Sequence, residues 1–173
     1  MEKYLLNTKN NHKVYLSIGS NIENKLDNLK TSLKYLTNDM KITLIKSSSI
    51  YNTDPLYYKK QSNFLNMVVE INTSYTLHQL LNSCKNIEYK MGRDFNAKKN
   101  HERIIDLDIL TYNDFIYNDE SISIPHPLIQ ERKFVLIPLV EITNDFIIPG
   151  INLSVENLLN NIKDNSKVCK FVS

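Results

Sequence analysis

Between residues 13 and 110, the chain alternates between two kinds of hydrophobic pattern. Apolar side chains stand at every second position in residues 13–20, as in a strand, whereas leucines recur at helical spacing in residues 26–36. Further predicted elements are a second helix at 76–91 and strands at 42–51, 64–72 and 103–110. The resulting order, β-α-β-β-α-β, is that of the ferredoxin-like fold, in which both helices cover one face of an antiparallel sheet.

Local signals add detail to this α+β prediction. Thr76 and Gln79 have the spacing of a capping box, and Gly92 is suited to end the second helix. We expect a loop at 52–63 and a small hairpin around Asn113–Asp114 that leads to 122–124. Extra C-terminal helices are expected at 131–142, with a kink near Pro138, and at 154–161.

Length and composition predict an ordinary globular protein. The 173 residues fit a loose N-terminal extension, 1–12, followed by a single domain, 13–173. A net charge of +2, from 21 basic and 19 acidic residues, gives no argument for a nucleic-acid or membrane partner. Two cysteines, Cys84 and Cys169, are too few for a disulfide framework, and no apolar run is long enough to span a bilayer. The cytoplasm is therefore the expected location.

The strand at 103–110 carries the strongest functional signal. Asp106 and Asp108 are two positions apart, so their side chains share one face of the strand. Neighbouring carboxylates repel each other, and a divalent cation removes that repulsion. Oxygen ligands suit Mg²⁺, especially Mg²⁺ that also contacts substrate phosphates. The alternative is a solvated strand face with two unconnected acids.

Other candidate site residues are predicted on the same side of the sheet. Phe64 and Asn66 alternate with core positions, so they should join the two acids on the face that the helices leave open. Nearby loops hold basic residues that could bind phosphate or could simply be solvated: Arg93, Lys98, Lys99, Arg103 and Arg132. His126, between two prolines, could donate to a phosphate or cap a turn. The chain has three glycines and no Gly-rich phosphate-binding motif.

Six segments in a fixed order resemble one enzyme family. They are Tyr15-Leu-Ser-Ile-Gly-Ser-Asn21, Ser49-Ile-Tyr-Asn-Thr-Asp-Pro-Leu56, Phe64-Leu-Asn66, Glu88 with Gly92-Arg93, Arg103-Ile-Ile-Asp-Leu-Asp-Ile-Leu110, and Ile124-Pro-His-Pro127 followed by Arg132-Lys-Phe134. Together, from about residue 13 to 148, the chain resembles 6-hydroxymethyl-7,8-dihydropterin pyrophosphokinases of folate biosynthesis.

The resemblance implies transfer of pyrophosphate from ATP to the pterin hydroxymethyl group, with release of AMP. It implies that Asp106 and Asp108 hold two Mg²⁺ ions and act in catalysis with Arg93 and Arg103, which faces the phosphates. The implied pterin-binding residues are Thr53, Leu56, Phe64, Asn66 and Phe134, with the two phenylalanines sandwiching the ring. The implied ATP-binding residues are Glu88, Arg93, Ile109, His126 and Arg132. The expected partners are these two small molecules, and the chain is expected to act as a monomer.

The chain also departs from the family pattern. Between Arg93 and Arg103, the family often carries a further arginine and a tryptophan, where this chain has Phe95 and Asn100. His101 replaces a usual glycine, and Asp54 replaces a common proline. Lys98 and Lys99 could restore the charge of the missing arginine but not its paired donors. We expect the loop from Arg93 to Glu102 to be mobile and to close over the substrates.

Two other functions remain possible from the sequence. The first is a ferredoxin-like module that binds single-stranded RNA on aromatic residues of the open face. That face offers mainly Phe64 and Tyr15 beside two acids, which repel phosphate unless a metal is present. The second is a pyrophosphokinase that has lost activity through its altered loop.

Overall fold

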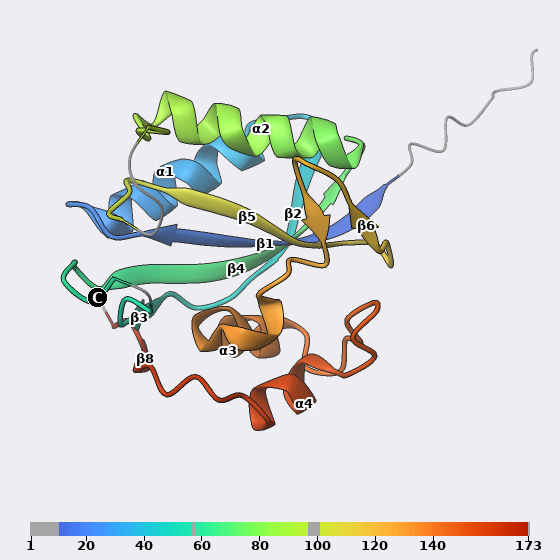
Figure 1. The fold of residues 1–173 in the computed structure, drawn as a ribbon. Helices are drawn as coiled ribbons and strands as arrows, with labels where there is room; N and C mark the ends of the chain where they lie inside the picture. Colours follow the sequence, from blue (N-terminus) through green and yellow to red (C-terminus); the bar gives the residue numbers. More distant parts are fainter. Residues whose placement is uncertain (1–10, 57, 97–100, 173) are drawn as a thin grey trace, which may run out of the picture.

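The computed structural model describes residues 11–56, 58–96 and 101–172, and its secondary structure surrounds one main β-sheet (Figure 1). The elements, in chain order, are β1 His12–Ser20, α1 Lys25–Thr37, β2 Ile42–Ser47, β3 Tyr51–Thr53, β4 Phe64–Thr73, α2 Leu77–Lys90, β5 Asp106–Tyr112, β6 Tyr117–Asn118, β7 Ser123–Ile124, the 3₁₀ turn η1 Ile129–Glu131, α3 Lys133–Ile142, α4 Val155–Asn160 and β8 Val168–Lys170.

The main sheet has the ferredoxin-like order. β1 lies between β5 and β4, and the far edge of β4 pairs with β2 along one part and with β3 along another. Every pairing is antiparallel. This arrangement confirms the fold class predicted from the order of the elements.

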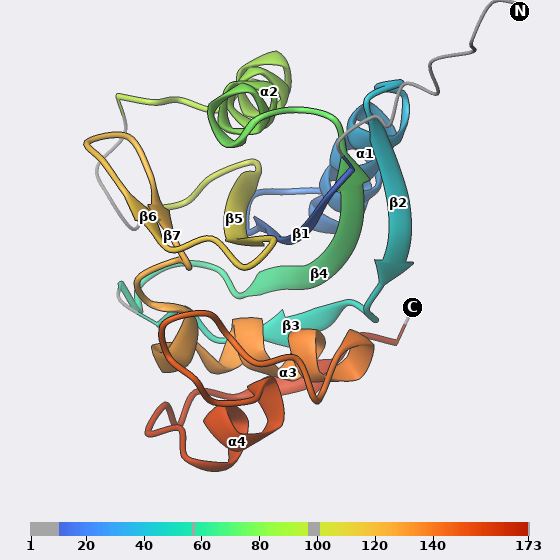
Figure 2. The same cartoon turned by 90° about the vertical axis from the view of Figure 1, so that its right-hand side faces the viewer.

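The first face of the sheet packs against α1 and α2, as predicted (Figure 2). Leu16 and Ile18 from β1 meet Leu36 from α1 and Leu80 and Cys84 from α2, all fully buried. The Thr76–Gln79 capping box and the positive φ of Gly92, 87°, also confirm the predicted ends of α2. α2 is therefore held firmly against β5.

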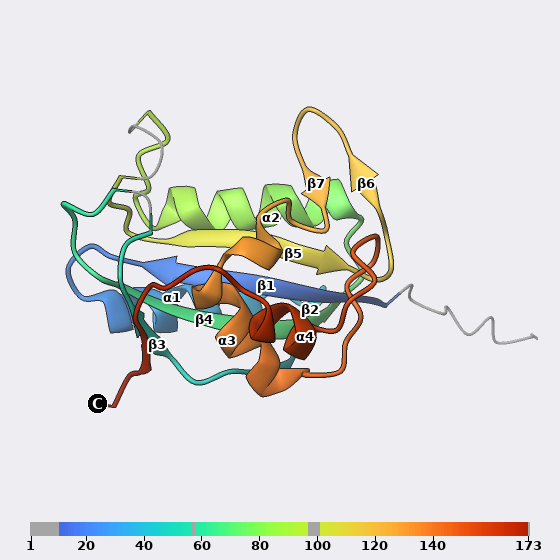
Figure 3. The ribbon, with the colours of Figure 1, turned by 60° about the horizontal axis from the view of Figure 1, so that its bottom comes forward.

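The prediction that the second face is open was wrong for half of that face. α3 and α4 cover it there, and Figure 3 shows them in front of the sheet. Tyr15, Val68 and Leu110 from the central strands pack against apolar residues of α3 such as Leu136 and Leu139. The ends of β4 and β5 that carry Phe64, Asn66, Asp106 and Asp108 lie beyond this second core. The face is therefore divided into a packed half and a half that lines a cavity.

The segment predicted as one strand at 42–51 is two strands, β2 and β3. A register shift between Leu44 and Lys46 already disturbs the pairing of β2 with β4. At Ser48, the side chain takes part in the ladder, because its Oγ accepts from Val68 N at 3.0 Å while its own N–H donates to Val68 O at 2.9 Å. β3 also includes Asn52 and Thr53, so the predicted loop begins two residues later than expected.

Three further details differ from the sequence prediction. The hairpin turn lies at Asp119–Ser121, where the Asp119 carboxylate accepts backbone N–H groups, and Asn113–Asp114 form a separate turn that ends β5. α3 begins at Lys133 after a 3₁₀ turn, and Pro138 lies within it. β8, which pairs with β3, was not predicted. Among the described residues, no helix is both long and apolar enough to cross a membrane.

Candidate active site

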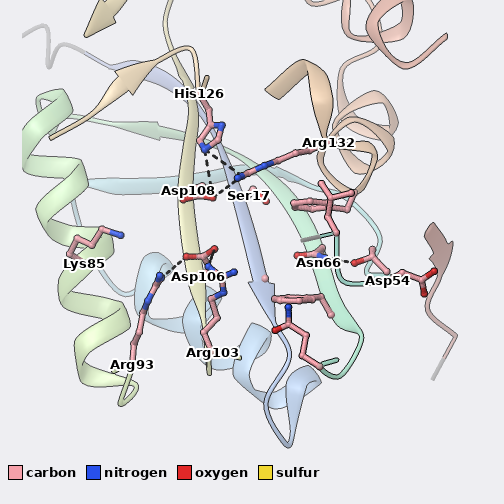
Figure 4. A pocket seen from close by; sticks show the side chains of 16 residues that line it. Ser17, Asp54, Asn66, Lys85, Arg93, Arg103, Asp106, Asp108, His126 and Arg132 are labelled. Carbon is pink, nitrogen blue, oxygen red and sulfur yellow. Dashed lines mark hydrogen bonds and ion pairs between the residues drawn. The ribbon is translucent and has the colours of Figure 1, made fainter. Parts of the chain in front are cut away.

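A cavity of about 230 Å³ lies at the uncovered end of the second sheet face (Figure 4). It brings together most of the side chains predicted for the site: Thr53, Leu56, Phe64, Asn66, Arg93, Arg103, Asp106, Asp108, His126, Arg132 and Phe134. Sequence analysis did not assign five other lining residues: Ser17, Gly19, Asp54, Gln61 and Lys85. Lys98, Lys99 and Asn100 lie outside the described residues, as does most of the predicted N-terminal extension.

Two acids on β5 form one wall of this cavity. Asp106 and Asp108 point into it, while Ile105 and Leu107 are buried in the core on the opposite face. This is the alternation that the sequence predicted. The Asp106 carboxylate accepts from Arg93 at 2.5 Å and from Arg103 at 3.0 Å. β5 therefore presents two carboxylates side by side to a half-buried space.

Asp108 has weaker partners than Asp106. Arg132 lies 3.4 Å and His126 3.9 Å from its Oδ2. Burial and the Asp106 charge raise the pKa of Asp108 to about 6. Burial opposes ionisation of Asp106 too, but Arg103 and Arg93 outweigh it and lower the pKa of Asp106. The pair thus holds one well-stabilised negative charge and one poorly stabilised one.

His126 is a neutral group at pH 7. Burial and the nearby Arg132 guanidinium lower its pKa to about 4. The cis peptide bond between Ile124 and Pro125 precedes it, and its Nδ1 accepts the backbone N–H of Leu128 at 3.1 Å. The imidazole therefore reaches the cavity from a fixed turn.

Glu88 is a fully buried carboxylate next to the cavity, and it does not line it. Its Oε1 accepts from Arg93 at 2.5 Å and from the backbone N–H of Leu107 on β5 at 2.8 Å. Its Oε2 accepts from Lys85 at 3.0 Å. Glu88 therefore joins α2 to β5 at the residue between the two acids, and it orients two cations at the edge of the cavity.

The opposite side of the cavity is mainly aromatic and amide-lined, with Asp54 at its outer edge. Phe64 and Phe134 line it, with the Arg103 guanidinium 5.6 Å from the Phe64 ring centre. Asn66, on β4, donates to Thr53 Oγ1 at 2.7 Å. A Cβ atom at Gly19 would lie 2.4 Å from Asn66 Oδ1, so the amide occupies space that only glycine leaves free. This side suits a flat ring with polar edges.

A second cavity, of about 300 Å³, adjoins the first. Its apolar walls include Leu81, Ile109 and Pro127, and the β6–β7 hairpin adds Ile122 together with polar and acidic side chains, those of Asp119, Glu120, Ser121 and Ser123. Ile109, predicted to bind ATP, lies here and not in the first cavity. Three residues line both cavities: Lys85, Asp108 and His126. The two spaces therefore meet beside the acids.

One of the five unassigned lining residues, Ser17, could have been placed by a local sequence pattern. Ser17 lies on the polar face of β1, opposite Leu16 and Ile18, so alternation could have placed it. Gly19 had no such signal, because its contact with Asn66 joins two strands that are far apart in the sequence. Lys85 lies on α2, one turn before Glu88, and its direction depends on how that helix packs against β5.

The comparisons with known proteins agree with the geometry. The family model for 7,8-dihydro-6-hydroxymethylpterin-pyrophosphokinase matches residues 15–144. The chain belongs to this family. The 2-amino-4-hydroxy-6-hydroxymethyldihydropteridine pyrophosphokinase of Bacillus subtilis is 41% identical over 132 residues, which are 76% of this chain and 78% of that protein.

Several relatives are much longer proteins. The folic acid synthesis protein fol1 of Schizosaccharomyces pombe is 40% identical over 148 residues, 86% of this chain but 20% of that protein. The chain spans about a fifth to a quarter of the first three curated relatives that it matches. A crystal structure of Plasmodium falciparum HPPK-DHPS superposes with a TM-score of 0.72 at 17% identity, covering 92% of this chain and 47% of that one. At that identity, the likeness shows the fold.

The acidic pair fits a cation that is shared with a bound ligand. In the part of the chain that the structure describes, no group of three or more His, Cys, Asp or Glu side chains could hold a metal ion. Two carboxylates alone make an incomplete site. Mg²⁺ accepts such sites, because it keeps several waters and completes its coordination with substrate phosphates. Asp106 and Asp108 therefore suit Mg²⁺ that arrives with a polyphosphate.

The raised pKa of Asp108 predicts a pH-dependent stability of the metal-free protein. A folded-state pKa of about 6, above the ordinary value of 3.8, means that the ionised form is disfavoured on folding. The resulting loss of folding stability is complete above pH 6 and disappears as the pH falls toward 4. In chelator, Asp108→Asn should therefore raise the free energy of unfolding at pH 8, and the gain over wild type should shrink toward pH 5. Urea denaturation across this range measures it.

The exposed Asp145 offers a matched control, because Asp145→Asn should leave the unfolding free energy nearly unchanged throughout. A lower stability of Asp108→Asn at pH 8 would contradict the assignment of a poorly stabilised charge at Asp108.

Proposed function

We propose that this chain transfers the terminal diphosphate of ATP to the hydroxymethyl group of 6-hydroxymethyl-7,8-dihydropterin, in folate synthesis. The observation that carries the proposal is the place of Asp106 and Asp108, between an aromatic cavity and a second cavity. A phosphate chain that runs from one cavity to the other would pass the two carboxylates. One chain supplies all these residues, so the proposed unit is a monomer. Both substrates are soluble metabolites, and the proposed location is the cytoplasm.

The aromatic cavity is the proposed pterin site. Phe64 and Phe134 would sandwich the bicyclic ring, which gains from stacking and from burial of its faces. Asn66, fixed by Thr53 and Gly19, would hydrogen-bond to the amide-like edge of the ring. The loop at Leu56 would close the end of the site. The hydroxymethyl group would then point toward the acids on β5.

The second cavity is the proposed adenosine site. Leu81 and Ile109 offer apolar contact for the base, and His126 lies where the sugar and phosphates would meet the first cavity. Arg93, Arg103 and Arg132 line the first cavity and can each offer paired donors to phosphate oxygens. Glu88 would support ATP binding through Arg93 and Lys85, since it does not line either cavity.

Asp106 and Asp108 would hold Mg²⁺, and two ions are proposed. When bound, the metal neutralises phosphate charge and orients the phosphate chain. The carboxylates are ion-paired with arginines in the metal-free protein. Because a cation would take over these carboxylates, the arginines would become available to the phosphates. The carboxylates and arginines would thus stabilise each other before ATP and Mg²⁺ bind, and would take part in catalysis afterwards.

The chain would catalyse the transfer by positioning and by electrostatics. The hydroxymethyl oxygen forms a bond to the β-phosphorus, and the bond from that phosphorus to the oxygen it shares with the α-phosphate breaks. AMP leaves with that oxygen, and the hydroxyl proton passes to water. The aromatic pair holds the nucleophile in line, and Arg93, Arg103 and Arg132 stabilise charge that develops on the phosphate oxygens.

The proposal is tested by the products formed from ATP and the pterin. We expect AMP and the pterin diphosphate in the presence of Mg²⁺ and neither in chelator. Asp106→Ala and Asp108→Ala should each lower turnover on the order of 100-fold or more, because each removes a ligand of the charge-neutralising metal. The folded state should persist, since Asp108→Ala relieves like-charge repulsion and Asp106→Ala leaves Arg93 paired with Glu88. Formation of ADP, or full activity in either variant, would contradict the proposal.

Lys85 provides a second test, on the nucleotide side. Phe95 stands where the family often has an arginine, and the Lys85 ammonium lies 6.0 Å from the Phe95 ring centre. Lys85 points toward the acids from α2 and lines both cavities. We expect Lys85→Gln to weaken ATP binding about tenfold through loss of a charged hydrogen bond, with adenosine binding unchanged. Calorimetry with both ligands measures this.

Lys90 is the matched control on the same helix. It is exposed and lines neither cavity, so Lys90→Gln should bind ATP as the wild type does. Equal losses of ATP affinity in the two lysine variants would show a general charge effect. They would contradict the assignment of Lys85 to the ATP site.

A further inference from the structure

We propose that residues 163–170, here called the C-terminal strap, position the pterin side of the site and set the affinity for the pterin without affecting ATP. This inference rests on the proposed function. The family model ends at residue 144, so the strap lies outside the matched segment. No strap residue lines either cavity described above. The start of the strap lines a separate hollow with Asp54, Leu56 and Gln61, which also border the first cavity. The strap would therefore act on the site through the residues that it holds.

The first contact of the strap is with the start of α3. Asp164 Oδ2 accepts the backbone N–H of Lys133 at 2.9 Å, and its Oδ1 accepts that of Ser166 at 2.8 Å. Arg132, at the N-cap position of α3, has no oxygen in its side chain and gives no cap hydrogen bond. A carboxylate at this end also interacts favourably with the helix dipole. Asp164 thus supplies a missing cap one residue before Phe134.

The second contact is with the opposite wall of the pterin site. β8 pairs with β3, and Val168 stands opposite Thr53, the residue that holds Asn66. Asp54 N donates to Lys167 O at 3.0 Å, and Lys167 N donates to Asp54 Oδ2 at 3.4 Å. β3 has three residues and lies between β4 and β8. The strap therefore covers the edge of β3 that β4 does not.

Glu141 links the two walls of the proposed pterin site, α3 and β3. From α3, its carboxylate accepts from Ser49 N at 2.8 Å and from Tyr51 Oη at 3.0 Å, just before and within β3. Lys170, at the end of the strap, lies 3.4 Å from the same carboxylate. Figures 1 and 2 show β3, β8 and α3 in the same part of the molecule. The strap, β3 and α3 form one connected unit.

The contacts of the strap should affect the binding of the two substrates differently. Phe134 on α3 and Thr53 on β3 belong to the proposed pterin site, and their spacing determines whether the ring fits between Phe134 and the sheet. Lys85, Ile109 and the β6–β7 hairpin, which line the proposed adenosine site, receive none of the strap contacts described above. Arg132 also stands at the capped end of α3, but its guanidinium is positioned by Asp108 and His126, neither of which receives a strap contact described above. Loosening the strap should therefore cost preorganisation for the pterin and leave ATP binding nearly unchanged.

The test is Asp164→Ala. We expect the KM and the dissociation constant for the pterin to rise about fivefold, as expected for loss of one helix cap, with KM for ATP unchanged. Asp164→Asn, which keeps an acceptor oxygen, should recover most of the affinity. The exposed Asp145→Ala, elsewhere in the C-terminal region, should match wild type. Assays are run well below the melting temperature of each variant, so that unfolding does not contribute.

The outcomes separate the two proposals. If the wild type forms no AMP with the pterin, the proposed function fails. If the wild type is active but Asp164→Ala binds the pterin normally, or loses ATP and pterin affinity equally, only the role of the strap is overturned. A defect that Asp164→Asn does not repair would also overturn it.

Discussion

The repulsion between Asp106 and Asp108 is the interaction around which this site is built. The alternation of β5 forces both carboxylates onto one face, and the core on the other face fixes the strand so that they cannot separate. Arg93, Arg103 and Arg132 neutralise the pair from the surrounding loops. Without a ligand, these arginines reduce the repulsion between the two acids. In the proposed function, a divalent cation takes the place of the arginines at the carboxylates, and a polyphosphate takes the place of the carboxylates at the arginines.

The rest of the fold places two cavities beside that pair. α3 and α4 pack over half of the sheet face, which leaves a cavity with Phe134 at its border. α2 and the β6–β7 hairpin form the second cavity on the other side of Asp108. Glu88 links these parts, since it bonds to β5, to Arg93 and to Lys85. The ferredoxin-like sheet thus holds the charges while the added elements shape the spaces around them.

Local sequence patterns predicted the sheet and the strand face that carries Asp106, Asp108, Phe64 and Asn66, because strand alternation and helix capping act over a few residues. The Asp106 and Asp108 face, the Thr76 cap and the helix end at Gly92 are of this kind. The other site residues, such as Thr53, Leu56 and Phe134, were expected only from the resemblance to the family. The split at Ser48, the strand β8 and the direction of Lys85 depend on contacts between distant segments, and no local pattern encodes them. The cover of α3 over Tyr15 and Leu110 was missed for the same reason.

The most direct test of this account is the binding of Mn²⁺, a paramagnetic substitute for Mg²⁺, measured by electron paramagnetic resonance. Two carboxylates already paired with arginines should bind Mn²⁺ weakly in the protein alone. With a non-hydrolysable ATP analogue, binding should become tight, and Asp108→Asn should abolish the gain while Asp145→Asn keeps it. Tight Mn²⁺ binding without nucleotide, or a gain that survives in Asp108→Asn, would contradict the claim that β5 and the phosphates share the metal.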